Sequence, residues 1–306
     1  MAFTAKDVQA LREKTGVGMM DCKKALVESD GDMDKAIDIL REKGLASAAK
    51  KAGRVAAEGV VAAYSDATCG ALVEINCETD FVAKGEPFVN LANTVAKTVV
   101  ATKPADVDAL LKETAADSDC TVEACVQEVF LALRENMKIR RFVVAEGHVA
   151  TYIHAGGTVG VMVSFDTDDA TAAKPEFDVM GKDVAMQVAA MNPSYLNEAA
   201  VPAEVLAHEK EILVAQMKED PKMANKPDQV LAKIVDGKIG KYYKENCLLD
   251  QVFVKDGDLS VSQYVAKVAK ELGADIKVTG FVRYAKGEGI EKKEEDFAAE
   301  IASMLK

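Results

Sequence analysis

The chain has 306 residues, of which 49% are apolar and 29% are charged, the composition of a soluble globular protein with room for more than one core. Its formal net charge of −12 argues against sequence-independent binding of nucleic acid, which needs a positive surface, so we expect no direct nucleic-acid partner. No segment reaches the ~18 apolar residues of a membrane span, and residues 1–6 lack the apolar core of a secretory signal, so we expect no membrane partner.

Three short helical patterns open the chain over residues 4–43. Glycines interrupt the apolar spacing at Gly16 and Gly31, and Gly44 is expected to end the third helix. An alanine-rich, basic stretch over residues 45–58 then predicts a helical linker. A bundle of about forty residues is close to the lower limit for an independent core, so we expect a small, self-contained accessory module.

Apolar side chains lie on the bend between the first two of these helices, at Val17, Met19 and Met20. Core filling is the default interpretation of such residues. Methionine side chains adapt to many shapes, however, so the same bend also suits a docking surface. The glycines of this bend follow a helix and not a strand, which argues against a dinucleotide-binding loop.

An internal repeat begins at Gly59 and predicts the fold of the centre of the chain. The matched segments are Gly59–Tyr64 with Gly147–Tyr152, Gly70–Val73 with Gly160–Val163, Phe88–Pro104 with Phe177–Pro193, and Phe142–Val143 with Phe281–Val282. Each copy has the pattern of a β-hairpin, then helices, then a third strand. The predicted fold class is therefore α+β, with two core subdomains that each pack helices on one face of an antiparallel sheet.

The second copy carries an insertion after Pro193 that predicts an antiparallel helical arm. Residues Ala203–Glu219 form one amphipathic helix, and a second begins at Pro227. Its expected seam residues follow coiled-coil spacing, at Leu231, Val235, Lys238 and Tyr242. The predicted organisation is an N-terminal three-helix domain with its linker (1–54), core subdomain N (55–146), core subdomain C (147–286) with the inserted arm (203–246), and a C-terminal helical module (287–306).

One stretch joins a buried strand to a helix start at the point where the chain leaves the first core. Thr79 and Asp80 are N-capping residue types, and Phe81 and Val82 follow within the first turn. Phe81 is either a hydrophobic staple that folds back on its helix or an aromatic anchor presented to a partner. The second copy passes through residues 164–169 without a counterpart of this tetrad, which favours the presented aromatic.

No pattern in the chain predicts an active site. There is no glycine-rich phosphate loop, no nucleophile elbow and no cluster of His and Cys at metal-binding spacing, so we expect no metal, no cofactor and no enzyme activity. Cys77 with His154 and Asp80 could be imagined as a thiol triad, but nothing in their spacing supports it. His154 precedes a pair of glycines on a hairpin tip, where it is either a contact residue or a polar turn residue. The scattered cysteines indicate reduced thiols and a cytoplasmic location.

Three segments of the sequence resemble signatures of the bacterial elongation factor Ts family. They are Leu11–Leu26 with its Thr15-Gly16-x-Gly18-Met19-Met20-Asp21 run, Glu74–Lys84 with its Thr79-Asp80-Phe81-Val82 tetrad, and the tail Thr279–Glu291. The resemblance covers the whole chain, and two long ordered motifs make a chance match improbable. It implies a ubiquitin-associated-like three-helix domain, a duplicated core, a coiled-coil arm and a C-terminal helix.

The resemblance also implies a function in translation elongation, as a guanine-nucleotide exchange factor and not an enzyme. The implied partner is elongation factor Tu in its GDP-bound form with its Mg²⁺. Thr79 to Val82 would then bind the partner, with Asp80 and Phe81 intruding beside its magnesium and nucleotide. Arg12, Met19 and Met20 would hold the same nucleotide-binding domain, and His154 would be a further contact.

Two other functions remain open from the sequence. One is a small-molecule enzyme that uses the cleft between subdomains, with Cys77 as nucleophile. The other is a helical scaffold that binds its partner without accelerating nucleotide release. The sequence also leaves open whether the chain forms a homo-oligomer.

Overall fold

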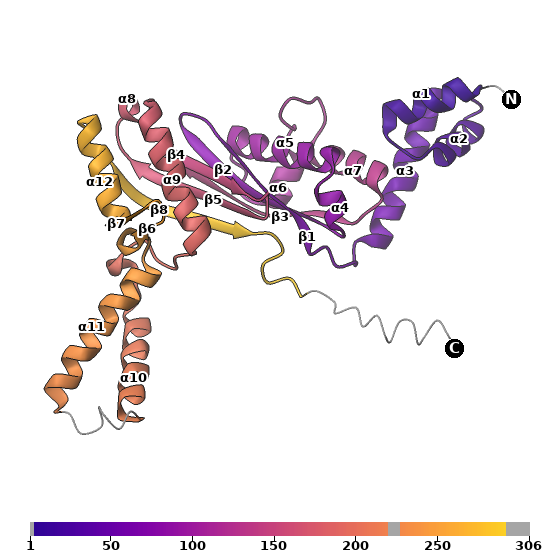
Figure 1. The fold of residues 1–306 in the computed structure, drawn as a ribbon. Helices are drawn as coiled ribbons and strands as arrows, with labels where there is room; N and C mark the ends of the chain where they lie inside the picture. The colour runs from indigo at the N-terminus through magenta and orange to yellow at the C-terminus, as the bar shows by residue number, and fades with distance from the viewer. Residues whose placement is uncertain (1–2, 220–226, 292–306) are drawn as a thin grey trace.

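The computed structural model describes residues 3–219 and 227–291 and shows an elongated molecule. A helical module lies at one end, two three-stranded sheets lie in the middle, and a helical hairpin projects from the other end (Figure 1). The mixed α+β class predicted from the sequence is confirmed. Among the described helices, none is long and apolar enough to cross a membrane.

The helical module packs its apolar faces around Leu11 and Leu26. Its helices are α1 (Ala5–Thr15), α2 (Met19–Glu28) and α3 (Met33–Lys51). The end of the third helix expected at Gly44 is wrong, because α3 continues through much of the predicted linker to Lys51.

Position 44 of α3 is occupied by glycine because a side chain there would collide with Leu131 of α7 (Val122–Leu133). A Cβ added to Gly44 would lie 2.0 Å from Leu131 Cδ2. Leu131 itself belongs to the apolar core of the helical module. The core of the module thus includes a residue from the central part of the chain, and whether the module folds by itself stays a prediction.

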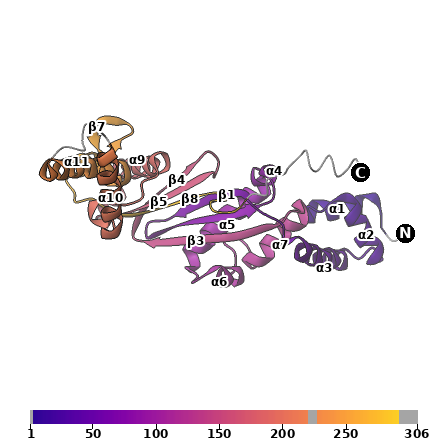
Figure 2. The same ribbon diagram turned by 90° about the horizontal axis from the view of Figure 1, so that it is seen from below.

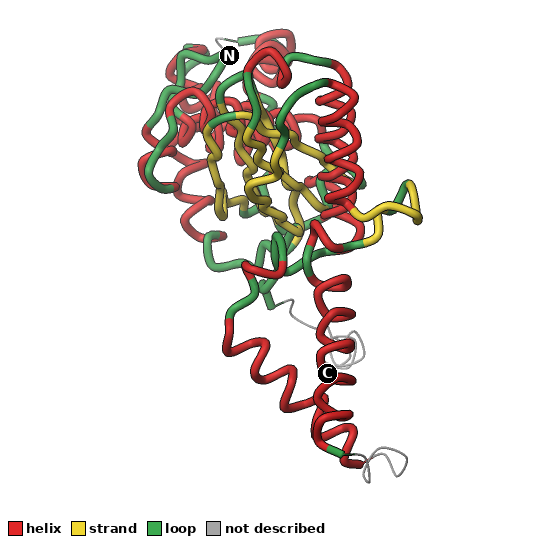
Figure 3. Tube along the Cα trace, turned by 90° about the vertical axis from the view of Figure 1, so that its left-hand side faces the viewer, coloured by secondary structure: helices red, strands yellow, loops and turns green. Residues whose placement is uncertain are grey.

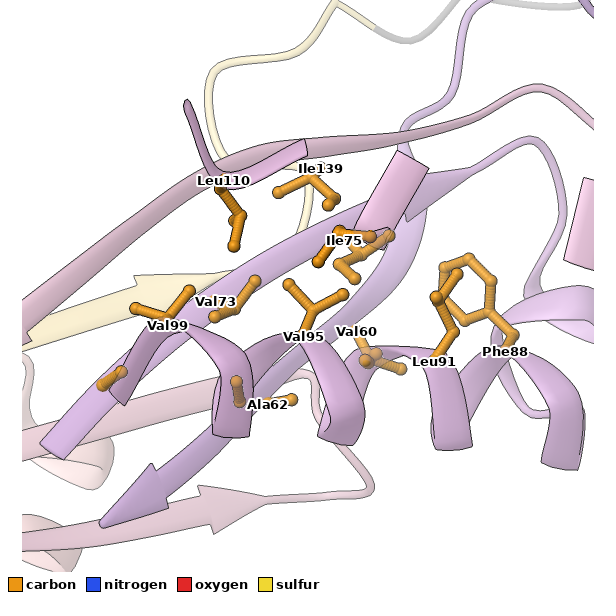
Figure 4. Close-up of a cluster of buried hydrophobic side chains, with 14 of the residues drawn as sticks. Val60, Ala62, Val73, Ile75, Phe88, Leu91, Val95, Val99, Leu110 and Ile139 are labelled. Atoms are coloured by element: carbon orange, nitrogen blue, oxygen red, sulfur yellow. The ribbon is translucent and has the colours of Figure 1, made fainter. Parts of the chain in front are cut away.

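The first sheet is antiparallel, with the strand order β1-β2-β3. Its strands are β1 (Glu58–Ser65), β2 (Cys69–Cys77) and β3 (Met137–Glu146). The helices between β2 and β3 are α4 (Asp80–Ala83), α5 (Glu86–Thr102), α6 (Val107–Lys112) and α7. β2 is buried along its whole length, and Figure 4 shows Val95 and Val99 of α5 packed against Val73 and Ile75 of this strand.

The second sheet repeats this plan with the order β4-β5-β8. Its strands are β4 (His148–His154), β5 (Val159–Asp166) and β8 (Lys277–Ala285), and its helices are α8 (Asp169–Ala172), α9 (Pro175–Met191) and α12 (Val261–Leu272). The likeness extends to a bulge in the pairing with the third strand. The register shifts after Glu74 in the first copy and after Ser164, its counterpart in the second.

The two sheets pack back to back, so that helices cover the outer face of each (Figure 3). Val61 and Met162 are buried in the layer between them. A glycine in the second strand of each copy allows the other sheet to approach closely, because it has no side chain. A Cβ added to Gly70 would lie 2.4 Å from Val149, and one added to Gly160 would lie 2.4 Å from Val61.

The insertion in the second half is a helical hairpin of α10 (Ala203–Glu219) and α11 (Asp228–Asn246). Met217 of α10 packs against Val235 and Ile239 of α11. The seam expected at Lys238 and Tyr242 is wrong, because the residues packed against α10 lie one step further along the helix: Ile239, which is buried, and Tyr243, which is partly buried. After the hairpin, the chain passes through the strands β6 (Val252–Phe253) and β7 (Asp256–Ser260) before α12. The C-terminal helical module expected over residues 287–306 lies outside the described residues except for residues 287–291, which are not helical.

A buried carboxylate joins the end of the second half to the first sheet. Glu74 has no exposed surface and accepts hydrogen bonds from Arg140 Nη1 (3.0 Å), Arg141 Nε (2.6 Å) and the backbone N–H of Gly287 (2.7 Å). Burial raises the pKa of Glu74, but the hydrogen bonds from Gly287 and the two arginines outweigh it and hold the pKa below its usual value. Glu74 is therefore charged in the folded protein.

We expect Glu74→Gln to destabilise the protein at neutral pH by about 3 kcal/mol, because two arginines lose their buried counter-charge. Since the folded pKa of Glu74 is depressed, its contribution is complete above the unfolded pKa of about 4.3 and is lost as the pH falls through the folded pKa. Urea melts at pH 7 and pH 3 measure this, with Glu146→Gln, which removes an exposed carboxylate paired with Lys103, as the control. A gap between wild type and Glu74→Gln that stays constant with pH would contradict the assignment.

Candidate functional site

The residues singled out after β2 form a one-turn helix at the edge of the first sheet. Thr79 caps α4, since its Oγ1 accepts the backbone N–H of Val82 (3.3 Å). Ala83 turns into the core, whereas the side chain of Phe81 is 85% exposed. Among the described residues, no other large apolar side chain is so exposed. The staple is therefore excluded, because a staple would bury the aromatic ring against its own helix.

The first residues of this turn form hydrogen bonds with the segment that follows α7. Thr79 donates its backbone N–H to Glu135 Oε2 (2.9 Å) and its hydroxyl to Glu135 Oε1 (2.6 Å). The neighbouring Glu78 accepts the backbone N–H of Asn136 (2.6 Å). The exposed Phe81 therefore stands on a turn whose first residues have fixed partners.

Asp80 places a negative charge beside the aromatic ring. Its carboxylate forms an ion pair with Lys84 (2.6 Å), and this hydrogen bond and charge hold the pKa of Asp80 below its usual value. The carboxylate is about half exposed and faces solvent. The turn thus presents an apolar wedge with an ionised carboxylate next to it.

The second copy of the repeat contains the same turn, which corrects the expectation that it has no counterpart. The helix α8 follows β5 and precedes α9 at the same spacing, and Asp168 caps it by accepting the N–H of Thr171 (2.9 Å). Counted from the matched Phe88 and Phe177, the position of Phe81 is taken by Ala170. The backbone turn is common to both copies, and only the aromatic side chain is specific to the first.

A shallow groove joins this turn to the hairpin tip of the other copy. Its walls include Ala83 and Lys84 beside Phe81, and Ile153, Gly156 and Gly157 from the β4–β5 hairpin. The hairpin is held there by a hydrogen bond from the N–H of Val61 in β1 to the carbonyl oxygen of Gly157 (2.8 Å).

His154 lies at the end of β4, on this hairpin, and is exposed. Its Nδ1 lies 3.0 Å from the hydroxyl of Tyr152. The hairpin that carries His154 and the α4 turn border the same groove, although they belong to different halves of the repeat; the groove is lined by the neighbouring Ile153 and not by His154 itself.

The N-terminal candidates lie on the helical module, at the same end of the molecule as α4 (Figure 2). Arg12 is exposed, and the side chains of Met19 and Met20 are 42% and 64% exposed at the start of α2. Val17 is fully buried in the core of the module. The two interpretations of this bend therefore divide between its residues: Val17 fills the core, and the two methionines face solvent.

The imagined thiol triad is not assembled. Cys77 has no exposed surface, its Sγ donates to the carbonyl oxygen of Thr79 (3.2 Å), and burial together with the charge of Glu135 raises its pKa to about 12. His154 makes its contact with Tyr152 instead. Within residues 3–219 and 227–291, no cluster of His, Cys, Asp or Glu is suited to hold a metal ion.

No pattern in the sequence indicated a role for the segment Arg134–Asn136. It reads as a polar loop between an apolar helix and a strand, and its contacts with Thr79, Glu78 and Asp21 exist only in the folded chain. The structural role of such a polar residue can be predicted only when the distant segment that it contacts is known.

Comparison with known proteins adds a family to this geometry. The family model described as elongation factor TS matches residues 78–288. The chain is 50% identical over 309 aligned positions to elongation factor Ts of Clostridium botulinum (strain ATCC 19397 / Type A), covering 99% of this chain and 98% of that protein. It is 52% identical over 307 positions to elongation factor Ts of Clostridium perfringens (strain SM101 / Type A), covering 99% of each.

We expect Cys77 to resist thiol reagents at pH 8 in the native protein, because it is buried and its pKa is about 12. Cys120 and Cys125 are partly exposed and serve as the internal comparison. Mass spectrometry after timed labelling measures each site. Labelling of Cys77 as fast as that of Cys120 would contradict its placement and reopen the thiol mechanism.

Proposed function

The chain belongs to the elongation factor Ts family, and from this premise we propose that it is a guanine-nucleotide exchange factor that binds elongation factor Tu in its GDP-bound form and promotes release of GDP during translation elongation. The proposed wedge is the turn from Thr79 to Val82, with Asp80 and Phe81 intruding beside the magnesium and nucleotide of the partner. The observation that carries this proposal is the exposed aromatic ring of Phe81 on an anchored turn. A role in translation would place the protein in the cytoplasm.

The two side chains of the wedge would act in different ways. Insertion of Phe81 into the partner buries apolar surface, which favours the complex and displaces whatever the ring pushes aside. The ionised carboxylate of Asp80 brings negative charge close to a site where Mg²⁺ and phosphate oxygens already bind each other. No covalent bond forms or breaks in this step. The protein itself needs no cofactor, because the work is done by differential binding.

Energy bookkeeping explains why a wedge alone is not enough. Binding of this protein and binding of GDP must weaken each other by the same coupling free energy. A weakening of about 1,000-fold corresponds to roughly 4 kcal/mol, whereas burial of one Phe side chain supplies about 1.5–3 kcal/mol. Other contacts are needed to stabilise the complex with the opened partner.

Two further surfaces are proposed to supply those contacts. One is the bend of the helical module with Arg12, Met19 and Met20, whose methionines are exposed while the neighbouring Val17 holds the core. The other is the hairpin with His154, which borders the same groove as the α4 turn. A scaffold that binds without accelerating release is the second candidate, and measured nucleotide release separates the two.

We expect Phe81→Ala to cost the free protein less than about 1 kcal/mol of stability, because the ring is exposed. The same change should slow stimulated GDP release about ten- to a hundredfold, from the loss of roughly 1.5–3 kcal/mol of burial in the complex. Urea melts and stopped-flow release of fluorescent GDP from elongation factor Tu measure the pair. Val179→Ala, which trims an exposed apolar residue of α9, is the matched control. A large stability loss with normal release would return Phe81 to a structural role.

We expect Met19→Ala combined with Met20→Ala to raise the concentration needed for half-maximal exchange by about tenfold or more. Both side chains are exposed in the free protein and would be buried only in the complex, so their removal weakens the complex. The maximal release rate should change far less. Val17→Ala serves as the contrast, because it should lower the melting temperature of the module. Unchanged half-saturation in the double variant would remove the bend from the partner surface.

A further inference from the structure

We propose that Glu135 is a positioning residue for nucleotide exchange: it acts through Thr79 to fix the direction in which the α4 turn presents Phe81. The proposal rests on the proposed function and extends it to a residue outside the tetrad. It also assigns a role to the segment Arg134–Asn136, which joins α7 to β3.

The carboxylate of Glu135 holds Thr79 at two points. Oε2 accepts the backbone N–H at 2.9 Å, and Oε1 accepts the hydroxyl at 2.6 Å. The same hydroxyl oxygen accepts the N–H of Val82 at 3.3 Å. The hydroxyl donates to Glu135 and accepts from Val82, and these two bonds together fix the orientation of the Thr79 side chain and the direction of the turn above it. Phe81 lies between the two residues whose positions are fixed in this way.

The segment that carries Glu135 is itself held by contacts on both sides. Arg134 donates to Asp21 of the helical module (3.2 Å), and its carbonyl oxygen accepts a hydrogen bond from Lys51 of α3. Asn136 donates its backbone N–H to Glu78 (2.6 Å). The bond between Glu135 and Thr79 is thus the middle link between the helical module, with Met19 and Met20 next to Asp21, and the turn that carries Phe81.

The second copy of the repeat is an internal comparison for this anchor. Its turn has the same backbone but no aromatic residue, and its cap Asp168 uses both carboxylate oxygens on Thr171 of its own helix. By the match of Phe142 with Phe281, the position of Glu135 is occupied by Ala274, which has no side-chain acceptor. The fold therefore forms this turn without an anchor. The anchor is found where the turn carries a wedge.

A positioning role and a purely structural role predict different kinetics. If Glu135 only stabilised the protein, its loss would reduce the folded fraction and lower exchange regardless of Phe81. If it positions Phe81, its loss should lower the maximal release rate with little effect on half-saturation, and should do nothing further once the ring is gone. Misplacement of a positioned group costs up to about 100-fold, so we expect a fall of about tenfold in the maximal rate.

The test is a double-variant cycle of Glu135→Gln and Glu135→Ala on the wild-type and Phe81→Ala backgrounds. Release of fluorescent GDP from elongation factor Tu is followed over a range of exchange-factor concentrations, with melts for each variant. Glu123→Gln, at an exposed carboxylate in the first turn of the same α7, is the control. Slower release on the wild-type background and no further slowing on Phe81→Ala supports the proposal. Normal release, or equal slowing on both backgrounds, overturns it.

The same cycle keeps this inference apart from the function on which it rests. Normal release by Phe81→Ala would overturn the wedge and the role of Glu135 together. Slow release by Phe81→Ala with normal release by both Glu135 variants would overturn only the role of Glu135.

A second measurement needs no partner. The chain contains no tryptophan, so Phe81→Trp introduces a single indole on the turn. We expect its fluorescence anisotropy to decay with a larger fast component when Glu135→Gln is added, because the turn gains freedom. Identical decays with and without Glu135→Gln would overturn the proposal even if that variant proved too unstable for kinetics.

Discussion

The contact between the backs of the two sheets determines where the α4 turn lies relative to the hairpin that carries His154. Gly70 and Gly160 let the sheets approach so closely that a β-carbon at either position would collide with a valine of the other copy. This contact brings the β4–β5 hairpin of the second half against β1 of the first, as the bond between Val61 and Gly157 shows. Without it, the α4 turn and the hairpin that carries His154 would lie on separate bodies. The groove they share is a product of duplication and close packing, and neither copy could form it alone.

A buried carboxylate adds a second connection between the two halves to the apolar contact between the sheets. The buried carboxylate of Glu74 collects two guanidinium groups from β3 and a backbone N–H from the segment after β8, so the end of the second half is fastened to the first sheet. The counterpart of Glu74 is Ser164 at the same bulge. The two copies thus share a backbone and differ in their polar side chains. The first copy holds Glu74, the anchored cap and the exposed aromatic ring.

The sequence predicted the features that depend on local pattern. Glycine and aromatic spacing gave the repeat, and the residues after β2 gave a capped turn with Phe81. Features decided by distant partners were not predictable. A glycine at position 44 is compatible both with a helix end and with close packing inside a helix. Only the position of Leu131, which packs against Gly44, shows that the second interpretation is right. The turn at α8 was overlooked because Asp168 replaces the Thr cap and Ala170 replaces the aromatic residue. Glu135 resembles any polar loop residue until Thr79 is placed opposite it.

The position of Leu131 in the core of the N-terminal helices has a consequence for how the protein is made. Residues up to Lys51 leave the ribosome before Leu131, yet Leu131 is the side chain that completes their core. At roughly 5–20 residues per second, several seconds separate the synthesis of α3 from that of Leu131. During that interval the three helices exist without their last core residue. The order of synthesis and the order of folding therefore differ in this part of the chain: the core of the three helices can be completed only after α7 has emerged.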